Sequence, residues 1–365
     1  MALANASYRR LRSLVDGPDL LNLAWTLDER RFLSIDLSSL MGAELLAEQK
    51  AGLPYLHSYF VQDPYGDREL GPTVGELFGR AGWDCEITCG AGVISLLHAL
   101  AQLAEGRPVY VTGDVYPDLP HWIEQQGGVC ASAFFDGLTR GGLVDHIRVL
   151  GCRLVLVERP SLVAAEADRD AGLDGLRHLC EAVAPQGAVV VVDESYANYC
   201  PPSYSSAVLV EELPNLVVLR GLSKAYGMGG LRLAYALTHR SLTPRVRAVV
   251  PPMLASSLSI RLGRAVLALG DATAALRQRV HTAKAEMTAL LTSAGVPVAD
   301  TSHSDVPYVM YEEQDTAAQQ WLESRGIIGK LQPLWSERLL GIAHKYRVSV
   351  PLSEERMGDF RRRLK

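Results

Sequence analysis

The sequence lacks both an excess of positive charge and any long uninterrupted hydrophobic run. Its 365 residues carry a formal net charge of −5, which argues against a nucleic-acid-binding protein, because such proteins show a basic patch or stripe. No apolar stretch reaches the ~20 residues that a membrane-spanning helix needs. The N-terminal stretch MALANASYRRLRSL also lacks the apolar core of a signal peptide. We therefore expect a cytoplasmic protein that binds neither nucleic acid nor membrane.

Metal-ligand and disulfide patterns are also missing. The six cysteines form no C-x-x-C pair, and the nine histidines show neither H-x-H nor H-x-x-x-H spacing. Scattered cysteines of this kind are typical of buried thiols in a reducing compartment and not of a disulfide framework. We expect no metal site.

What the sequence does contain is an alternation of apolar strands with helical patterns. Apolar runs bounded by turn residues predict strands at 85–88, 108–112, 153–158, 188–194 and 216–220. Helical spacing occurs between them at 93–104, 119–127 and 173–184. Runs such as AVVVVD are apolar at every position, as expected for strands covered on both faces. The alternation predicts a parallel, doubly wound α/β sheet.

The pattern changes near residue 250, where two long helical patterns lead into shorter strands such as PYVMY and YRVSV. This change predicts a smaller α+β domain. Chain ends often lie close together, so the N-terminal segment is expected to join that domain. The expected division is an N-terminal segment at 1–50 that contributes to the small domain or a dimer contact, a large domain at 51–248 and a small domain at 249–365.

Polar residues follow the predicted strands, and ligands of open parallel sheets bind beyond the carboxyl ends of the strands. The loop Gly90-Ala91-Gly92 precedes a helix, and backbone N–H groups at a helix start can bind phosphate. A tight turn explains the same residues equally well. Tyr116 follows the next strand, where its ring could stack on a planar ligand or belong to the core.

Two further strand ends carry charged residues. Asp193 closes the run AVVVVD, and a buried carboxylate there needs a cationic partner; a helix cap or surface turn is the alternative. Lys224 and Arg232 lie in LSKAYGMGGLRLAY. A lysine in such a crevice can form a Schiff base, and an arginine fork suits phosphate. Alone, Lys224 could be an exposed loop residue.

Pyridoxal 5'-phosphate (PLP) is a ligand that would use all of these residues together. It offers an aldehyde to a lysine, a ring nitrogen to an aspartate, a flat face to an aromatic ring and a phosphate to a glycine loop and an arginine.

The chain resembles the fold-type I PLP enzymes of the class I/II aminotransferase superfamily, with histidinol-phosphate aminotransferases nearest. The stretch VVVDESYANY is similar to the family's D-x-x-Y strand end, and LSKAYGMGGLRLAY to its S-K-x-x-x-x-x-G-x-R motif. The resemblance implies that Asp193 holds the pyridine nitrogen and Tyr196 the ring hydroxyl. It also implies that Lys224 forms the Schiff base, while Ser223 and Arg232 bind the phosphate.

The resemblance extends to the rest of the chain. KYRVSVPLSEERMGDF is similar to the C-terminal segment of the family, which implies that Arg347 binds the substrate α-carboxylate. TCGAGVISLLHAL resembles the phosphate loop, with backbone donors at Gly90, Ala91 and Gly92, and VYPDL places Tyr116 as the stacking aromatic ring.

The resemblance to this family also has implications for the fold and the assembly of the protein. It implies a mostly parallel sheet with helices on both faces, a smaller α+β domain, and a homodimer with shared active sites. LHSYFVQDPYGDREL resembles the segment whose tyrosine reaches the phosphate of the neighbouring subunit. Tyr59 is the choice for that role, with Tyr65 as its competitor.

One family motif is replaced. ERPSLVAAEADRDAG stands where N-P-x-N-P-T-G is usual, and no asparagine occurs between Cys152 and Asp193. The usual asparagine donates a hydrogen bond to the ring oxygen of the cofactor. We expect an aminotransferase that acts on an amino acid or a similar substrate. The alternatives are a PLP enzyme of another reaction type, such as elimination, cyclisation, racemisation or decarboxylation, and a non-catalytic binding module.

Overall fold

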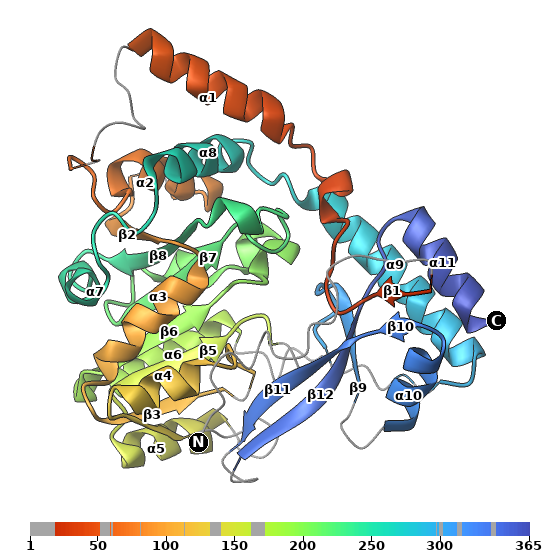
Figure 1. The fold of residues 1–365 in the computed structure, drawn as a ribbon. Helices are drawn as coiled ribbons and strands as arrows, with labels where there is room; N and C mark the ends of the chain where they lie inside the picture. Colours follow the sequence, from red (N-terminus) through yellow and green to blue (C-terminus); the bar gives the residue numbers. More distant parts are fainter. Residues whose placement is uncertain are drawn as a thin grey trace.

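The computed structural model describes residues 19–51, 59, 61–80, 82–112, 114–131, 140–161, 172–296, 298, 302–311, 316–336 and 341–365. A large sheet with its helices and a smaller unit beside it form the two parts of the molecule (Figure 1). The small unit contains the C-terminal strands and helices.

Seven strands form the large sheet, in the order β2-β8-β7-β6-β5-β3-β4. Their bounds are Cys85–Gly90 for β2, Pro108–Val111 for β3, Val129–Ala131 for β4, Leu154–Glu158 for β5, Val189–Asp193 for β6, Leu216–Gly221 for β7 and Ala234–His239 for β8. Pairing is parallel except at β8, which runs antiparallel to both β2 and β7. The mostly parallel sheet that the sequence predicts is confirmed.

Helices cover both faces of this sheet. They are α2 (Asp67–Leu77), α3 (Val93–Leu100), α4 (Leu119–Gln125), α5 (Arg140–Leu150), α6 (Leu173–Val183), α7 (Thr243–Val249) and α8 (Ser257–Leu267). Strand β6 shows why every position is apolar. Val189 and Val191 pack with α3, α4 and α7 on one face, whereas Val190 and Val192 pack with α2, α5 and α6 on the other.

Two strands of the large sheet escaped the sequence prediction for physical reasons. Strand β4 has only three residues, Val129–Ala131, at the edge of the sheet. Strand β8 directly follows the glycine-rich stretch that holds Arg232, and its antiparallel direction breaks the strand–helix alternation on which the prediction rested.

The small unit contains a three-stranded antiparallel sheet in the order β11-β12-β9. Its strands are β9 (Tyr308–Tyr311), β11 (Lys330–Ser336) and β12 (Gly341–Ser349), and its helices are α9 (Ala274–Ser293), α10 (Thr316–Ser324) and α11 (Glu354–Leu364). The N-terminal strand β1 (Leu21–Asn22) pairs with β10 (Ile327–Ile328). Leu21 and Leu23 are buried in the same core as α9 and α11, so the N-terminal segment joins the small unit at this point.

The expected division after residue 248 falls before α8. Ile260, Val266 and Leu267 of that helix pack in a core of the large sheet, while α9 belongs to the core of the small unit. We therefore place the start of the small unit between α8 and α9.

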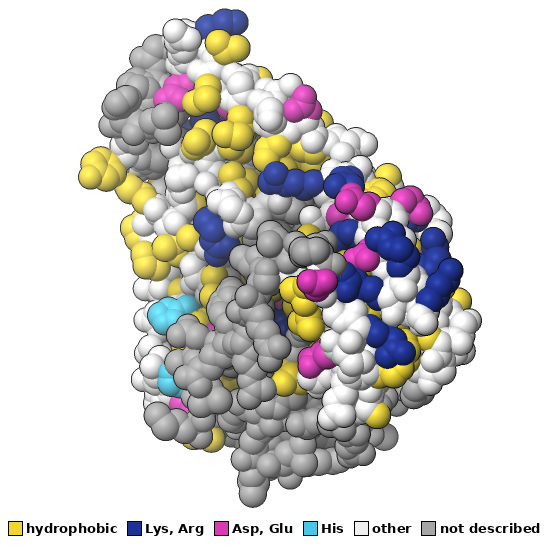
Figure 2. All heavy atoms as spheres, turned by 45° about the vertical axis from the view of Figure 1, so that its right-hand side comes forward, with side chains coloured by type: hydrophobic (Ala, Val, Ile, Leu, Met, Phe, Trp, Pro, Cys, Tyr) yellow, Lys and Arg dark blue, Asp and Glu magenta, His cyan; other side chains and the backbone are white. Residues whose placement is uncertain are grey.

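Helix α1 (Leu37–Ala51) lies at one edge of the molecule and exposes apolar side chains (Figure 1). Met41, Leu45 and Leu46 are all exposed, and Figure 2 shows apolar side chains gathered in this upper part of the surface. Among the described helices, none combines the length and the apolar character that a bilayer span requires.

Candidate active site

The predicted site residues meet where the carboxyl ends of the central strands face the small unit. Two adjoining cavities lie there, and Tyr116, Asp193, Ser195 and Lys224 line both of them. We call one the helix-side cavity, because the first turn of α3 forms a wall. The other is the strand-side cavity, because residues of β11 and β12 form its wall.

Lys224 lies in the turn that follows β7. Its carbonyl accepts a hydrogen bond from the backbone N–H of Gly227 at 2.8 Å, and Gly227 has a φ of 60°, a conformation that favours glycine. The ammonium nitrogen Nζ lies 5.1 Å from the centre of the Tyr196 ring and 5.8 Å from that of Trp25. The turn therefore holds the amine between two aromatic rings in the cavity.

Asp193 ends β6 and is buried beside Lys224. Its Oδ1 accepts two hydrogen bonds from Ser195, at 2.9 Å from the backbone N–H and at 2.6 Å from the hydroxyl. Burial raises the pKa of this carboxyl, while the two Ser195 bonds and the charge of Lys224 act to lower it. Within the described residues Oδ2 accepts no hydrogen bond, so it can receive one from a ligand donor.

Tyr196 and Arg347 are linked across the two units. Nη1 of Arg347 donates to the Tyr196 hydroxyl at 3.2 Å, and Nη2 donates to the carbonyl of Ala24 at 3.0 Å. Burial acts to raise the pKa of Tyr196, but the charges of Lys224 and Arg347 outweigh it and lower the pKa overall. The two cations therefore favour the phenolate form of Tyr196 more than water does.

Arg347 is an uncompensated buried cation. Its side chain is 4% exposed, and it forms no ion pair with any carboxylate in the described part of the chain. A buried charge without a counter-ion is costly. Because Arg347 also lines the strand-side cavity, an anionic ligand group there would supply the missing partner.

Arg232 lines the helix-side cavity together with residues of α3. Its guanidinium donates to the carbonyls of Ala91 at 2.9 Å and Gly229 at 3.1 Å. Gly92 has a φ of 83°, and a Cβ there would collide with the Arg232 guanidinium. Gly92 therefore allows the loop at residues 90–92 and the side chain of Arg232 to approach each other closely.

One of the three predicted backbone donors of this loop is engaged within the turn. The N–H of Gly92 donates within the turn to the carbonyl of Gly90 at 2.8 Å. The cavity wall is instead formed by Val93 and Ile94, in the first turn of α3, where backbone N–H groups lack helical partners. Ser223 also lines this cavity.

The remaining predicted tyrosines lie in different surroundings. Tyr116 lines both cavities, and its ring stacks on Trp122 with centres 5.5 Å apart. Tyr59 is 84% exposed. The hydroxyl of Tyr65 donates to the carbonyl of Arg247 at 3.3 Å. Tyr65 therefore already has a hydrogen-bond acceptor in its own chain.

Several cavity residues were missed by the sequence prediction. Trp25, Glu158 and Lys330 all line the strand-side cavity. Glu158 closes an apolar strand as Asp193 does, so the same rule could have found it. Lys330 opens β11, a strand that was not predicted, and its Cα partner in β12 is Arg347.

Glu194, the neighbour of Asp193, points away from the cavities. It is fully buried and forms ion pairs with Arg220 at 2.7 Å and Arg159 at 3.2 Å. Its carboxylate also accepts bonds from Ser205 and Ser206. Burial acts to raise the pKa of Glu194, but the two arginine charges and the serine bonds lower it overall. The Glu194 carboxylate therefore joins the ends of β5 and β7 to the segment that contains Ser205 and Ser206.

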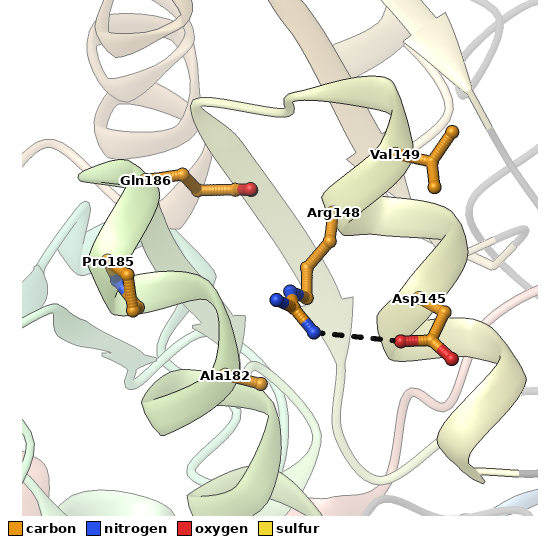
Figure 3. A pocket seen from close by; sticks show the side chains of 6 residues that line it. All are labelled: Asp145, Arg148, Val149, Ala182, Pro185 and Gln186. Atoms are coloured by element: carbon orange, nitrogen blue, oxygen red, sulfur yellow. Dashed lines mark ion pairs between the residues drawn. The ribbon is translucent and has the colours of Figure 1, made fainter.

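A separate hollow lies between α5 and the end of α6 (Figure 3). An exposed ion pair at 3.7 Å joins Arg148 and Asp145 across part of it, and such pairs contribute little. None of the predicted site residues lines this hollow, so the chemistry belongs to the two cavities around Lys224.

Comparison with known proteins gives a consistent result. A family model described as aminotransferase class I and II matches residues 60–330. The aromatic amino acid aminotransferase of Mycobacteroides abscessus is 33% identical over 254 residues, covering 66% of this chain and 70% of that protein. The histidinol-phosphate aminotransferase of Paracoccus denitrificans is 29% identical over 288 residues, covering 75% and 73%.

Solved structures share the fold at low sequence identity. The histidinol-phosphate aminotransferase of Sinorhizobium meliloti, solved in complex with PLP, has a TM-score of 0.72 and 17% identity, and the match covers 98% of this chain and 97% of that one. This likeness confirms the α/β fold that the sequence predicts.

Proposed function

Because the chain belongs to the class I and II aminotransferases, which are PLP-dependent enzymes, we propose that Lys224 binds the cofactor and moves the substrate proton. When bound, PLP supplies an aldehyde that joins amino groups and a ring that stabilises negative charge at the substrate Cα. Lys224 Nζ is the nucleophile toward that aldehyde. With the cofactor bound, the free amine of Lys224 would serve as the general base that takes the proton from the substrate Cα.

The residues of the two cavities fit the parts of this cofactor. Oδ2 of Asp193 lacks a donor among the described residues and can hold a protonated ring nitrogen. The first turn of α3, Ser223 and Arg232 surround the helix-side cavity and suit a phosphate. Tyr116 offers a ring for stacking, and Tyr196 a phenol beside Lys224.

The uncompensated charge of Arg347 is the observation that carries the substrate assignment. A planar guanidinium binds carboxylates in a bidentate manner, and Arg347 lines the same cavity as Lys224. We assign it to the α-carboxylate of an amino acid. Arg347 also donates a hydrogen bond to the Tyr196 hydroxyl, so the residue assigned to the substrate carboxylate contacts the phenol assigned to the cofactor.

A half-reaction tests this function directly. An amino acid donor added to the enzyme without a keto-acid acceptor is expected to yield one keto acid per active site and to bleach the absorbance of the lysine-bound cofactor. A keto-acid acceptor added afterwards restores that absorbance. Proton exchange at Cα with no keto acid from any donor would contradict transamination and favour the other reaction types.

Replacing Gly92 by alanine is expected to weaken PLP binding by about 10-fold to 100-fold. The φ of 83° and ψ of 160° at this position lie in a region that costs other residues about 1–3 kcal/mol, and the added Cβ displaces Arg232. Fluorescence titration of the apoenzyme with PLP measures the affinity. Gly106→Ala is the matched control, because Gly106 also has a positive φ but leaves its Cβ in open space. Equal affinity in both variants would contradict the assignment.

Lys330 provides a second cation for the substrate. Its Nζ lies 4.7 Å from the centre of the Trp25 ring. Burial, and then the charges of Arg347 and Lys224, lower the pKa of Lys330 to about 7. The side chain is therefore charged mainly below neutral pH in the free enzyme. We assign it to a second anionic group on the substrate.

The Lys330→Met variant is expected to lower kcat/KM for glutamate by about 10-fold at pH 6, since a charge-assisted hydrogen bond contributes about 1.5–3 kcal/mol. Glutamine, which lacks the second charge, serves as the reference substrate and is expected to change little. In the wild-type enzyme, the ratio of kcat/KM for glutamate over glutamine falls as pH rises through 7. A ratio that is independent of pH and unchanged in the variant would contradict the role of Lys330.

We also propose a two-fold homodimer in the cytoplasm, in which Tyr59 reaches the neighbouring active site. The high exposure of Tyr59 and the apolar residues on α1 support this assembly, because exposed apolar patches often mark interfaces. Tyr65 is the weaker candidate, since its hydroxyl and ring both contact Arg247. Six free thiols support a reducing compartment.

A further inference from the structure

Glu158 occupies a place in the cavity wall that matches that of Asp193. The two residues are Cα partners in the parallel pair β5–β6. Side chains alternate between the faces of a sheet, so Glu158 continues the face of Leu154 and Leu156, just as Asp193 continues that of Val189 and Val191. Both carboxyl groups therefore leave the same face of the sheet at its carboxyl edge, and both line the strand-side cavity.

The Glu158 carboxyl is buried and has no hydrogen-bond donor among the described residues. Its side chain is 5% exposed, and its backbone N–H donates to the hydroxyl of Thr112 at 3.1 Å. The other two cavity acids have donors: Ser195 donates to Asp193, and the Ser161 hydroxyl donates to Asp114 at 2.6 Å. An ionised carboxylate buried without donors is costly.

Burial and the neighbouring acids both favour the protonated form of Glu158. Burial raises its pKa well above the usual range, the neighbouring charges of Asp193 and Asp114 raise it further, and the charge of Lys224 opposes them. Tyr196 and Tyr308 also face this group electrostatically. Near neutral pH a protonated carboxyl is an O–H donor. Glu158 is the last residue of β5 and the first residue of the stretch that replaces the family motif.

We propose that Glu158 stays uncharged in the cavity and donates its proton in a hydrogen bond to the ring oxygen of PLP, supplying the donor that the absent asparagine would otherwise provide. The proposal rests on the proposed binding of PLP at Lys224. It assigns Glu158 as a residue that contacts and tunes the cofactor. It also keeps Asp193 as the ionised acid of the pair.

A pH titration of the visible absorbance of the lysine-bound cofactor tests this role. A donor to the ring oxygen favours its anionic form and lowers the titration midpoint. Glu158→Gln keeps a neutral donor of the same shape and is expected to leave the midpoint within about 0.3 pH units. Glu158→Leu removes the donor and is expected to raise the midpoint by about 1–2 pH units.

Removal of a negative charge would shift the titration midpoint in the opposite direction from removal of a donor. If Glu158 were ionised in the wild-type enzyme, both variants would lose an anion near the lysine-bound cofactor, and both midpoints would fall; that result would overturn the proposal. Unchanged midpoints in both variants would also overturn it. If the leucine variant does not fold, Glu158→Met removes the donor in its place, and an unchanged midpoint in the methionine variant would overturn the proposal.

Two further measurements separate this proposal from the proposed function. Glu29 interacts electrostatically with Lys224 but hydrogen-bonds to Tyr199, so Glu29→Gln is the control and its midpoint is not expected to rise. Borohydride reduction followed by mass spectrometry locates the cofactor. No adduct at Lys224 would contradict both proposals. An adduct at Lys224 together with a midpoint that falls in both Glu158 variants, or that stays unchanged in Glu158→Leu, contradicts the role of Glu158 alone.

Discussion

The Lys224→Ala variant is expected to lose transamination by at least about 10⁴-fold. One amine performs two tasks in the proposed mechanism, as the nucleophile toward the cofactor and as the base at the substrate Cα, and acid–base catalysis alone contributes about 10²–10⁴-fold. Single-turnover formation of keto acid measures the loss. The variant is also expected to bind PLP without a covalent bond, so that borohydride reduction leaves the chain unmodified.

Another lysine in the same cavity provides the control for this prediction. Lys330→Met is expected to retain the cofactor adduct at Lys224, because Lys330 lies on the substrate side beside Trp25 and Arg347. An adduct located at Lys330, or single-turnover activity of the Lys224→Ala variant close to that of the wild type, would contradict the assignment of Lys224.

The second large effect concerns stability. Glu194→Gln is expected to lower the free energy of unfolding by about 3–5 kcal/mol, since it leaves Arg220 and Arg159 buried without their anion. Urea denaturation at pH 7 measures the change. The folded-state pKa of Glu194 is lowered, so its stabilising contribution is present above the usual pKa of a glutamate. That contribution is lost as pH falls through the lower, folded-state pKa.

Glu212→Gln is the matched control for the stability prediction. Glu212 pairs with Arg177 at 3.0 Å on the surface, and such pairs contribute about 0–1 kcal/mol. The difference between the two variants isolates the effect of burial. Equal free energies of unfolding would show that the network around Glu194 does not stabilise the fold.

The sequence identified the residues whose position follows from local order. Asp193 and Lys224 stand directly after apolar strands, and strand ends of a parallel sheet share one edge, so their meeting could be predicted. Lys330 could not be predicted in this way. It enters the cavity because β11 pairs with β12 and places it opposite Arg347, a long-range pairing that no local pattern encodes.

Glu158 shows a different limit of prediction from sequence. The rule that identified Asp193 applies equally to Glu158, but the lack of a hydrogen-bond donor to this carboxyl among the described residues is visible only in the structure. Donors within the loop likewise could not be assigned from sequence. The hydrogen bond from Gly92 to Gly90 within the turn and the approach of Arg232 depend on backbone angles that the sequence GAG leaves open.

Asp193 and Glu194 are consecutive acids that face opposite sides of the sheet, one toward the cofactor cavity and one toward two buried arginines. A slip of one residue in the pairing of β6 would turn both side chains to the other face, because it moves every side chain of the strand across the sheet. Asp193 would then leave the cofactor cavity, and Glu194 would leave Arg220 and Arg159. One register error would therefore damage both the active site and the stability of the fold, so only a correctly paired sheet yields a working enzyme.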